Sequence, residues 1–89
     1  MFEFTDLNHR LQELSFQIFS NLCLSHDIVI KDGDLKIILK LIKNNSYCVL
    51  NDDYSEILIC EISEKTNKDV SDAFRPMVEN KYIIKELTK

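Results

Sequence analysis

Apolar residues recur at three- and four-residue spacing along much of the chain, which is the period of an amphipathic helix. The first such stretch begins after Thr5 or Asp6, and either side chain can cap a helix. Its apolar stripe consists of Leu7, Leu11, Leu14, Ile18 and Leu22, and is widened by Phe16, Phe19 and Cys23. The pattern predicts one long helix over residues 5–25.

This predicted helix is more apolar than one face of a small domain requires. Two interpretations stay open: an ordinary core helix, or a helix that packs against a second copy of the chain. On the second interpretation the protein is a homodimer, and its dimerisation surface is formed by Leu7, Leu11, Leu14, Ile18, Phe19 and Leu22.

The middle of the chain predicts one helix between two short apolar segments. Residues 28–30 are either a short strand or an apolar connection. The Asp32-Gly33 pair predicts a turn, because this dipeptide favours positive φ. Asp34 then caps a helix that ends at Asn44-Asn45, and residues 47–50 predict a short β-strand.

The last third predicts two helices joined by a tight turn and followed by a strand. The first helix spans residues 54–65 and the second spans roughly residues 69–80, with Pro76 expected to bend it. Asn67, between them, is the residue most suited to the left-handed conformation. Residues 82–87 predict a closing strand.

This order of elements, from about Asp34 to Leu87, resembles the winged helix-turn-helix family of small DNA-binding regulators. Residues 62–67 are similar to the family's turn after its second helix, and Val70-Ser71 with Phe74 match its recognition helix. Residues 77–83 match the entry into the family's strand, except that Lys81 stands where a glycine is usual.

The resemblance implies a mainly α (α+β) winged-helix-like fold with a long N-terminal helix. Its wing is truncated to two strands, in which residues 82–87 pair with residues 47–50. The chain is predicted to be a single domain over residues 1–89. Residues 1–27 supply the helix for dimerisation, and residues 34–87 form the helix-turn-helix core.

The function implied by the resemblance is sequence-specific binding of double-stranded DNA. Such a protein is a small transcriptional regulator or a plasmid or viral replication or partition factor. Arg75 is the base-contacting candidate, since its fork can bond guanine bidentately, and Lys65, Lys68 and Lys81 are placed to bind phosphate. The full set of implied DNA-binding residues is Lys65, Asn67, Lys68, Ser71, Asp72, Arg75 and Lys81.

Charge leaves a second function open. The net charge is −4, which argues against a general nucleic-acid binder. Only residues 65–89 are net basic, with six basic and four acidic residues, and Asp69 and Asp72 lie on the predicted recognition helix. The alternative is a protein–protein interaction module on the same scaffold. A strip of lysines at residues 36, 40 and 43 is either a solvated helix face or a second contact to the DNA backbone.

No motif indicates an enzyme, a metal site or a cofactor. The cysteines Cys23, Cys48 and Cys60 form no CxxC pair and read as small apolar residues of a reducing compartment. His9 and His26 share no metal-like spacing with other ligands, and a single glycine rules out a Gly-rich phosphate loop. No apolar run approaches the ~20 residues of a membrane span, so we expect a cytoplasmic protein.

Overall fold

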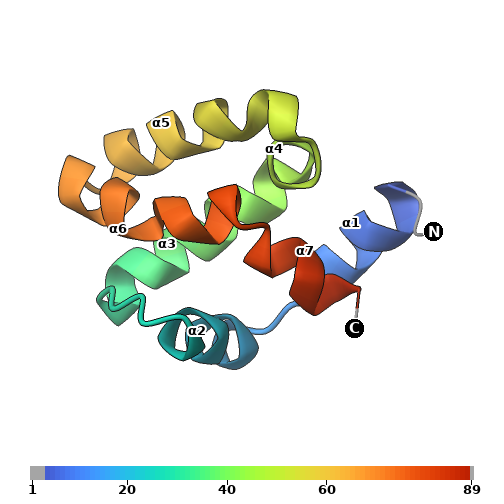
Figure 1. Ribbon diagram of the computed structural model, residues 1–89, viewed down its shortest axis with the longest axis horizontal. Coiled ribbons are helices and arrows are strands. Elements are labelled where there is room, and N and C mark those ends of the chain that lie inside the picture. The colour runs from blue at the N-terminus through green and yellow to red at the C-terminus, as the bar shows by residue number, and fades with distance from the viewer. Residues whose placement is uncertain (1–3, 89) are drawn as a thin grey trace.

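Every regular element in residues 4–88, the part of the chain that the computed structural model describes, is helical (Figure 1). A short 3-10 helix (Asp52–Tyr54) precedes the fifth α-helix. The α-helices are α1 (Phe4–Gln12), α2 (Phe16–Ser25), α3 (Asp32–Asn44), α4 (Ser46–Leu50), α5 (Ser55–Lys65), α6 (Lys68–Glu79) and α7 (Tyr82–Leu87). Residues 1–3 and 89 of the predicted domain lie outside the described residues.

The predicted mixed fold with a truncated wing is wrong, because residues 4–88 contain no strand. The segment at 47–50 belongs to α4, and the segment at 82–87 is α7. In α7, Ile83 and Leu87 are both buried. Residues four apart share a face in a helix, and Lys85, which would also share that face in a strand, is exposed. Packing therefore outweighs the β-propensity of the Tyr82-Ile83-Ile84 run.

The N-terminal apolar stretch forms two helices, where one over residues 5–25 was predicted. Ser15 interrupts it with an extended backbone (φ −80°, ψ 156°), and its Oγ accepts a hydrogen bond from the Ile18 N–H at 3.2 Å. A serine in this position satisfies a free N–H at a helix start. The break between α1 and α2 therefore follows from a capping residue that the apolar spacing conceals.

The boundaries of α3 also differ from the prediction. The helix begins at Asp32, so the predicted Asp32-Gly33 turn is its first turn. Asp32 and Asp34 both lie in that turn, where their negative charges interact favourably with the positive end of the helix dipole. Residues 28–30, which precede α3, have no regular structure and form the apolar connection between α2 and α3.

The helices enclose one apolar core. Phe19 of α2 packs on Phe74 of α6, with ring centres 5.9 Å apart and planes tilted by 54°. Burying a side chain of this size contributes about 1.5–3 kcal/mol to folding. The largest fully buried side chains are Phe19, Phe74, Leu11, Ile38, Ile42, Leu58, Ile62, Met77 and Ile83.

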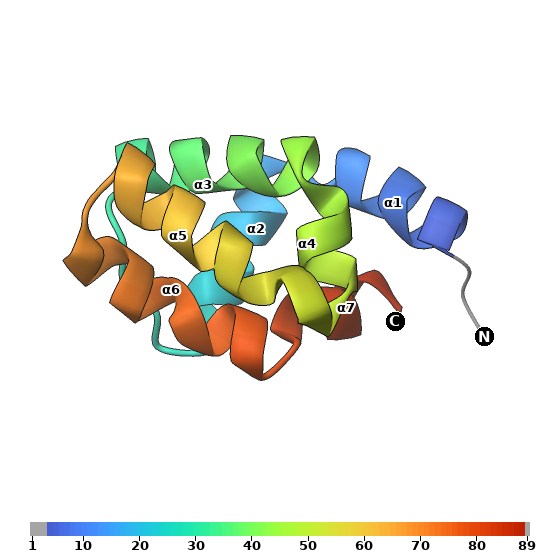
Figure 2. The ribbon, with the colours of Figure 1, turned by 90° about the horizontal axis from the view of Figure 1, so that it is seen from above.

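The α5–α6 pair has the predicted boundaries to within one residue at each helix end, but not the predicted geometry. Figures 1 and 2 show the two helices side by side and running in opposite directions. A DNA-binding helix-turn-helix crosses its helices at about 90–120°. The pair is therefore a helical hairpin, in which α6 lies along α5 and does not project from it.

Figure 2 shows α3 along one edge of the molecule, with α2 and α5 on its inner side. The inner face of α3 supplies Leu35, Ile38, Leu39 and Ile42 to the core. Gln12 of α1 ties the far end of α3 in place, because its Nε2 donates to the Lys43 carbonyl at 2.7 Å. The outer face of α3 is left to solvent along its length.

Candidate functional site

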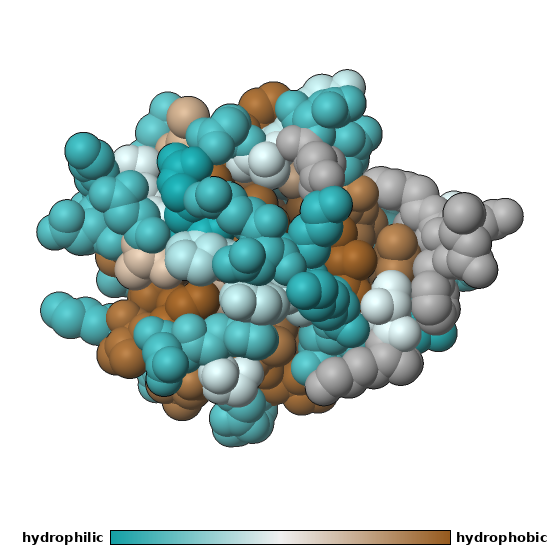
Figure 3. Space-filling view, in the orientation of Figure 1, coloured by the Kyte–Doolittle hydropathy of each residue, from teal (hydrophilic) through white to brown (hydrophobic). Residues whose placement is uncertain are grey.

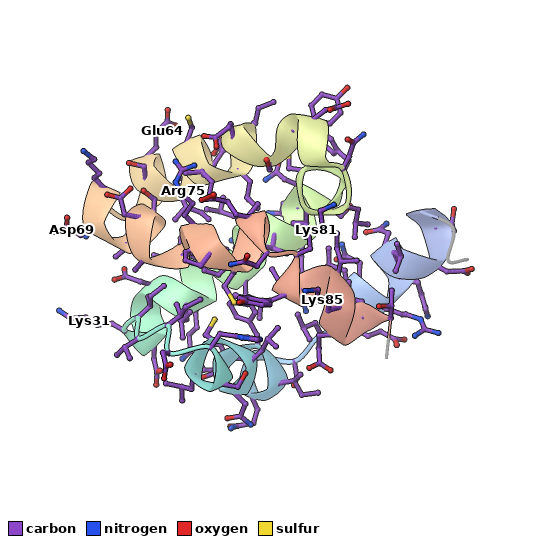
Figure 4. All side chains as sticks on the ribbon, in the orientation of Figure 1. Lys31, Glu64, Asp69, Arg75, Lys81 and Lys85 are labelled. Carbon is purple, nitrogen blue, oxygen red and sulfur yellow. The ribbon has the colours of Figure 1, made fainter. Side chains whose placement is uncertain are left out.

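Arg75, the predicted base-contacting residue, is bound by carboxylates of its own chain. Its guanidinium donates to Glu56 Oε1 at 2.7 Å and lies 3.9 Å from Glu79 Oε1. The hydrogen bond to Glu56 raises the pKa of Arg75 above its ordinary value. Figure 4 shows the side chain between α5 and α6. The guanidinium of Arg75 is therefore held against α5 and α6, and its charge is already paired with carboxylates of the same chain.

Ser71, also predicted to contact DNA, is 3% exposed and belongs to the core side of α6. Its Oγ donates to the Lys68 carbonyl at 3.0 Å. Ser71 is therefore not on the exposed face of α6, where the DNA contact was predicted. Ser71 is buried because of its position in α6. It lies three residues before Phe74, and Met77 follows Phe74 by three more, so all three lie near one face of the helix. Phe74 and Met77 are both fully buried.

Asn67 does not take the left-handed conformation predicted for the turn. Its backbone is extended (φ −163°, ψ 173°), and its Oδ1 accepts a hydrogen bond from the Val70 N–H at 2.9 Å. Asn67 is thus the N-cap of α6. Left-handed backbone occurs instead at Lys81 (φ 56°), immediately before α7. Lys81 therefore occupies a position that usually favours glycine.

The remaining predicted DNA-binding residues are exposed but do not form a basic surface. Lys65, Lys68 and Asp72 lie on the α5–α6 hairpin, whereas Figure 4 shows Lys81 apart from Arg75 at the turn before α7. Within residues 55–79 the exposed lysines number two, against five exposed carboxylates. These carboxylates are Glu56, Glu64, Asp69, Asp72 and Glu79. The hairpin surface is acidic.

The outer face of α3 carries the opposite charge. From Leu35 to Asn51 the sequence holds three lysines and no acidic residue. Lys36 and Lys40 are exposed, and Lys43 is half-buried. The sequence pattern identified this strip, but offered it only as a solvated face or an accessory DNA contact.

Two shallow grooves flank α3, and both have apolar floors. The first, of about 370 Å³, lies on the side of α1 and α2 and contains Phe16 and Leu39. The second, of about 430 Å³, lies on the side of α5 and contains Ile37 and Leu41. The polar residues that line one groove or both are Lys36, Lys40, Lys43, Lys65, Gln12 and Asn44. We call the residues of the two grooves together the lysine face.

The lysine face combines positive charge with apolar contact area. Its lining residues include four lysines and no carboxylate. Lys36 Nζ lies 5.5 Å from the centre of the Phe16 ring. Lysine stems can cover apolar surface in this way while the ammonium group stays in water. Sequence reasoning did not find the grooves, because Lys65 and Phe16 join the α3 lysines only through the fold.

The predicted dimerisation residues are mostly used within the chain itself. Leu11, Leu14, Phe19 and Leu22 are buried in its core, and Leu7 packs partly against that core. Ile18 is the exception, with 50% of its surface exposed. This stripe is therefore a core stripe, and dimerisation stays a prediction that needs another surface.

No group of three potential metal ligands comes together in residues 4–88. Cys23 and Cys48 are buried, whereas Cys60 is exposed on α5. Among the helices that the structure describes, none is long and apolar enough to cross a membrane.

Comparison with known proteins identifies no relative. No protein-family model, curated protein sequence or solved structure matches the chain. The function must therefore be inferred from the surface of this molecule alone.

Proposed function

We propose that the protein is a protein–protein interaction module that binds an acidic segment of a partner through its lysine face. The observation that carries the proposal is the composition of the two grooves, whose lining holds four lysines and no carboxylate above apolar floors. Acidic side chains of the partner pair with the lysines, and apolar side chains enter the grooves.

The combination of lysines and apolar residues in the lysine face favours a short amphipathic helix as the bound segment. A helix presents apolar residues at three- and four-residue spacing, with charged residues on either side of them. Docking of such a helix into an apolar groove is a recurrent mode of peptide recognition. Phe16 and Leu39, or Ile37 and Leu41, would contact the apolar residues, while the lysines select acidic flanks.

Duplex DNA fits the described surface less well. A DNA backbone offers phosphates to cations but no apolar side chains for the groove floors. The α5–α6 hairpin, where DNA contacts were predicted, is acidic, and its Arg75 is already bound to Glu56 and Glu79. These features support a protein partner over DNA.

The proposal is tested with a synthetic peptide that has leucines on one helical face and glutamates on its flanks. Replacing Lys36 and Lys40 by Glu removes two exposed charge pairs, each worth about 0.2–1 kcal/mol, and adds repulsion of similar size. We expect binding to weaken about tenfold, since 1.4 kcal/mol is a factor of ten. Fluorescence anisotropy of the labelled peptide measures the change.

A matched control keeps the net charge equal. Lys31→Glu with Lys68→Glu makes the same charge change at two exposed residues outside the lysine face. This double variant should bind the peptide nearly as well as the original chain. Equal weakening by both double variants would show that only overall charge matters, and tight binding of duplex DNA that Lys68→Glu abolishes would favour the hairpin as a DNA site.

A further inference from the structure

A second surface lies on the opposite flank of α2 from the lysine face and is uncharged. From Leu14 to Ser25 the sequence contains no acidic, basic or histidine residue. In a chain with 29% charged residues, the exposed residues of α2 are therefore all uncharged. Figure 3 shows apolar atoms interspersed with polar ones over α2.

Large apolar side chains are exposed on this surface. Ile18 is 50% exposed and Leu24 is 56% exposed. Beside Ile18 a groove of about 580 Å³ runs between α2 and α7, and its walls include Leu22 and Tyr82. Leaving such side chains in water has a free-energy cost that burial against a partner removes.

Contacts within the chain join the two walls of the groove. His26, at the end of α2, stacks on Tyr82 of α7 with ring centres 3.5 Å apart and planes 7° apart. Lys85 lies 5.6 Å from the centre of the same Tyr82 ring. These contacts fix α7 beside α2, so the groove is a formed feature with defined walls.

We infer that a second copy of this chain docks on the α2 face and makes a two-fold dimer. In a two-fold contact the same patch meets itself, so a patch with net charge repels its own copy. The uncharged α2 face meets this requirement, and the neighbouring Lys85 and Glu86 on the groove wall have opposite signs. The hairpin surface is acidic and the lysine face is basic, so neither is compatible with itself.

Dimerisation on α2 leaves the proposed peptide site accessible. The residues of the α2–α7 groove and those of the lysine face do not overlap. The inference rests on the uncharged face alone and is independent of whether the lysine face binds a peptide. Both results together would give a bivalent binder, in which two lysine faces act on one multivalent partner.

The test is sedimentation equilibrium of the chain and of two charge-introducing variants. We expect a monomer–dimer equilibrium for the original chain and a monomer for Ile18→Glu with Leu24→Glu. Ile57→Glu is the control for a carboxylate introduced at an exposed apolar residue elsewhere, since Ile57 is 49% exposed but lies on α5. This variant should dimerise like the original. Circular dichroism checks that all three chains are folded.

Two results overturn the inference. One is a monomer at every concentration of the original chain. The other is a dimer that Ile57→Glu dissociates and that the double substitution on α2 leaves intact, which would place the contact on α5. If the α2 variant is unfolded, Ile18→Ser with Leu24→Ser replaces it, because small polar side chains remove the apolar contact without adding charge.

Discussion

Among single residues, Cys23 is the one whose surroundings most change its chemistry. Its side chain is fully buried among apolar neighbours. Burial raises the pKa of the Cys23 thiol from 9.0 to about 11, because the charged thiolate loses its hydration. Cys60 is exposed on α5, so a thiol reagent should modify Cys60 well before Cys23.

The raised pKa makes stability depend on pH in alkaline solution. Between pH 9 and about 11 the unfolded chain loses the Cys23 proton while the folded chain keeps it. The folded state then binds more protons, so the free energy of unfolding falls as pH rises through this window. Below pH 9 the contribution of Cys23 to the free energy of unfolding is fully present.

Urea denaturation on both sides of this window, compared with Cys23→Ala, checks the prediction. The comparison between the two chains isolates the contribution of Cys23. The Cys23→Ala chain should lose less stability than the original on going from pH 9 to about 11. Identical losses would show that Cys23 titrates normally in the folded protein.

Residue positions were predicted better than residue roles. The sequence located Asn67 at the turn before α6 but predicted it to be left-handed, whereas it caps the helix. Left-handed backbone occurs at Lys81, which stands where the resemblance expects a glycine. Asparagine suits both roles. Which of these two roles Asn67 takes depends on how the following helix runs. Arg75 was correctly placed on α6, yet its pairing with Glu56 depends on a contact between residues 19 positions apart.

At the scale of elements, α6 depends on its N-cap. The Asn67 Oδ1 accepts from the Val70 N–H at 2.9 Å, at a helix start that would otherwise leave a donor unpaired. Asn67→Ala should therefore lower the free energy of unfolding by about 0.5–2 kcal/mol. Chemical denaturation followed by circular dichroism measures the loss.

Asn80→Ala is the control for this prediction. Asn80 is exposed at the other end of α6, where its backbone N–H donates to the Pro76 carbonyl at 3.0 Å. The substitution keeps that backbone bond and should change stability much less. Equal losses for the two variants would contradict the assigned role of the Asn67 side chain.

Helix patterns were recovered from the sequence, and short β-prone segments were not. The apolar spacing predicted α3, α5 and α6, because helices of 11–13 residues show several turns of their period. By contrast α4 has five residues and α7 has six. Over such lengths helical and alternating patterns coincide, and the deciding contacts come from distant residues.

For the molecule as a whole, the separation of charge is the main determinant of what it can bind. The sequence shows net charge −4, but not that acidic residues gather on the α5–α6 hairpin. The lysines line grooves beside α3. The resemblance to a DNA-binding family predicted that the binding site lies on α6. The fold brings Lys65 from α5 to the lysines of α3 and so moves the candidate site to another face.

The most direct test of the account maps the contact surface by nuclear magnetic resonance. The ¹⁵N-labelled chain is titrated in turn with the acidic amphipathic peptide and with a short duplex DNA of mixed sequence. With the peptide we predict shift changes at backbone amides of α3, of Phe16 and of Lys65, and little change along α6. Shift changes confined to α6 and the turn before it, caused by the DNA and not by the peptide, would contradict the account.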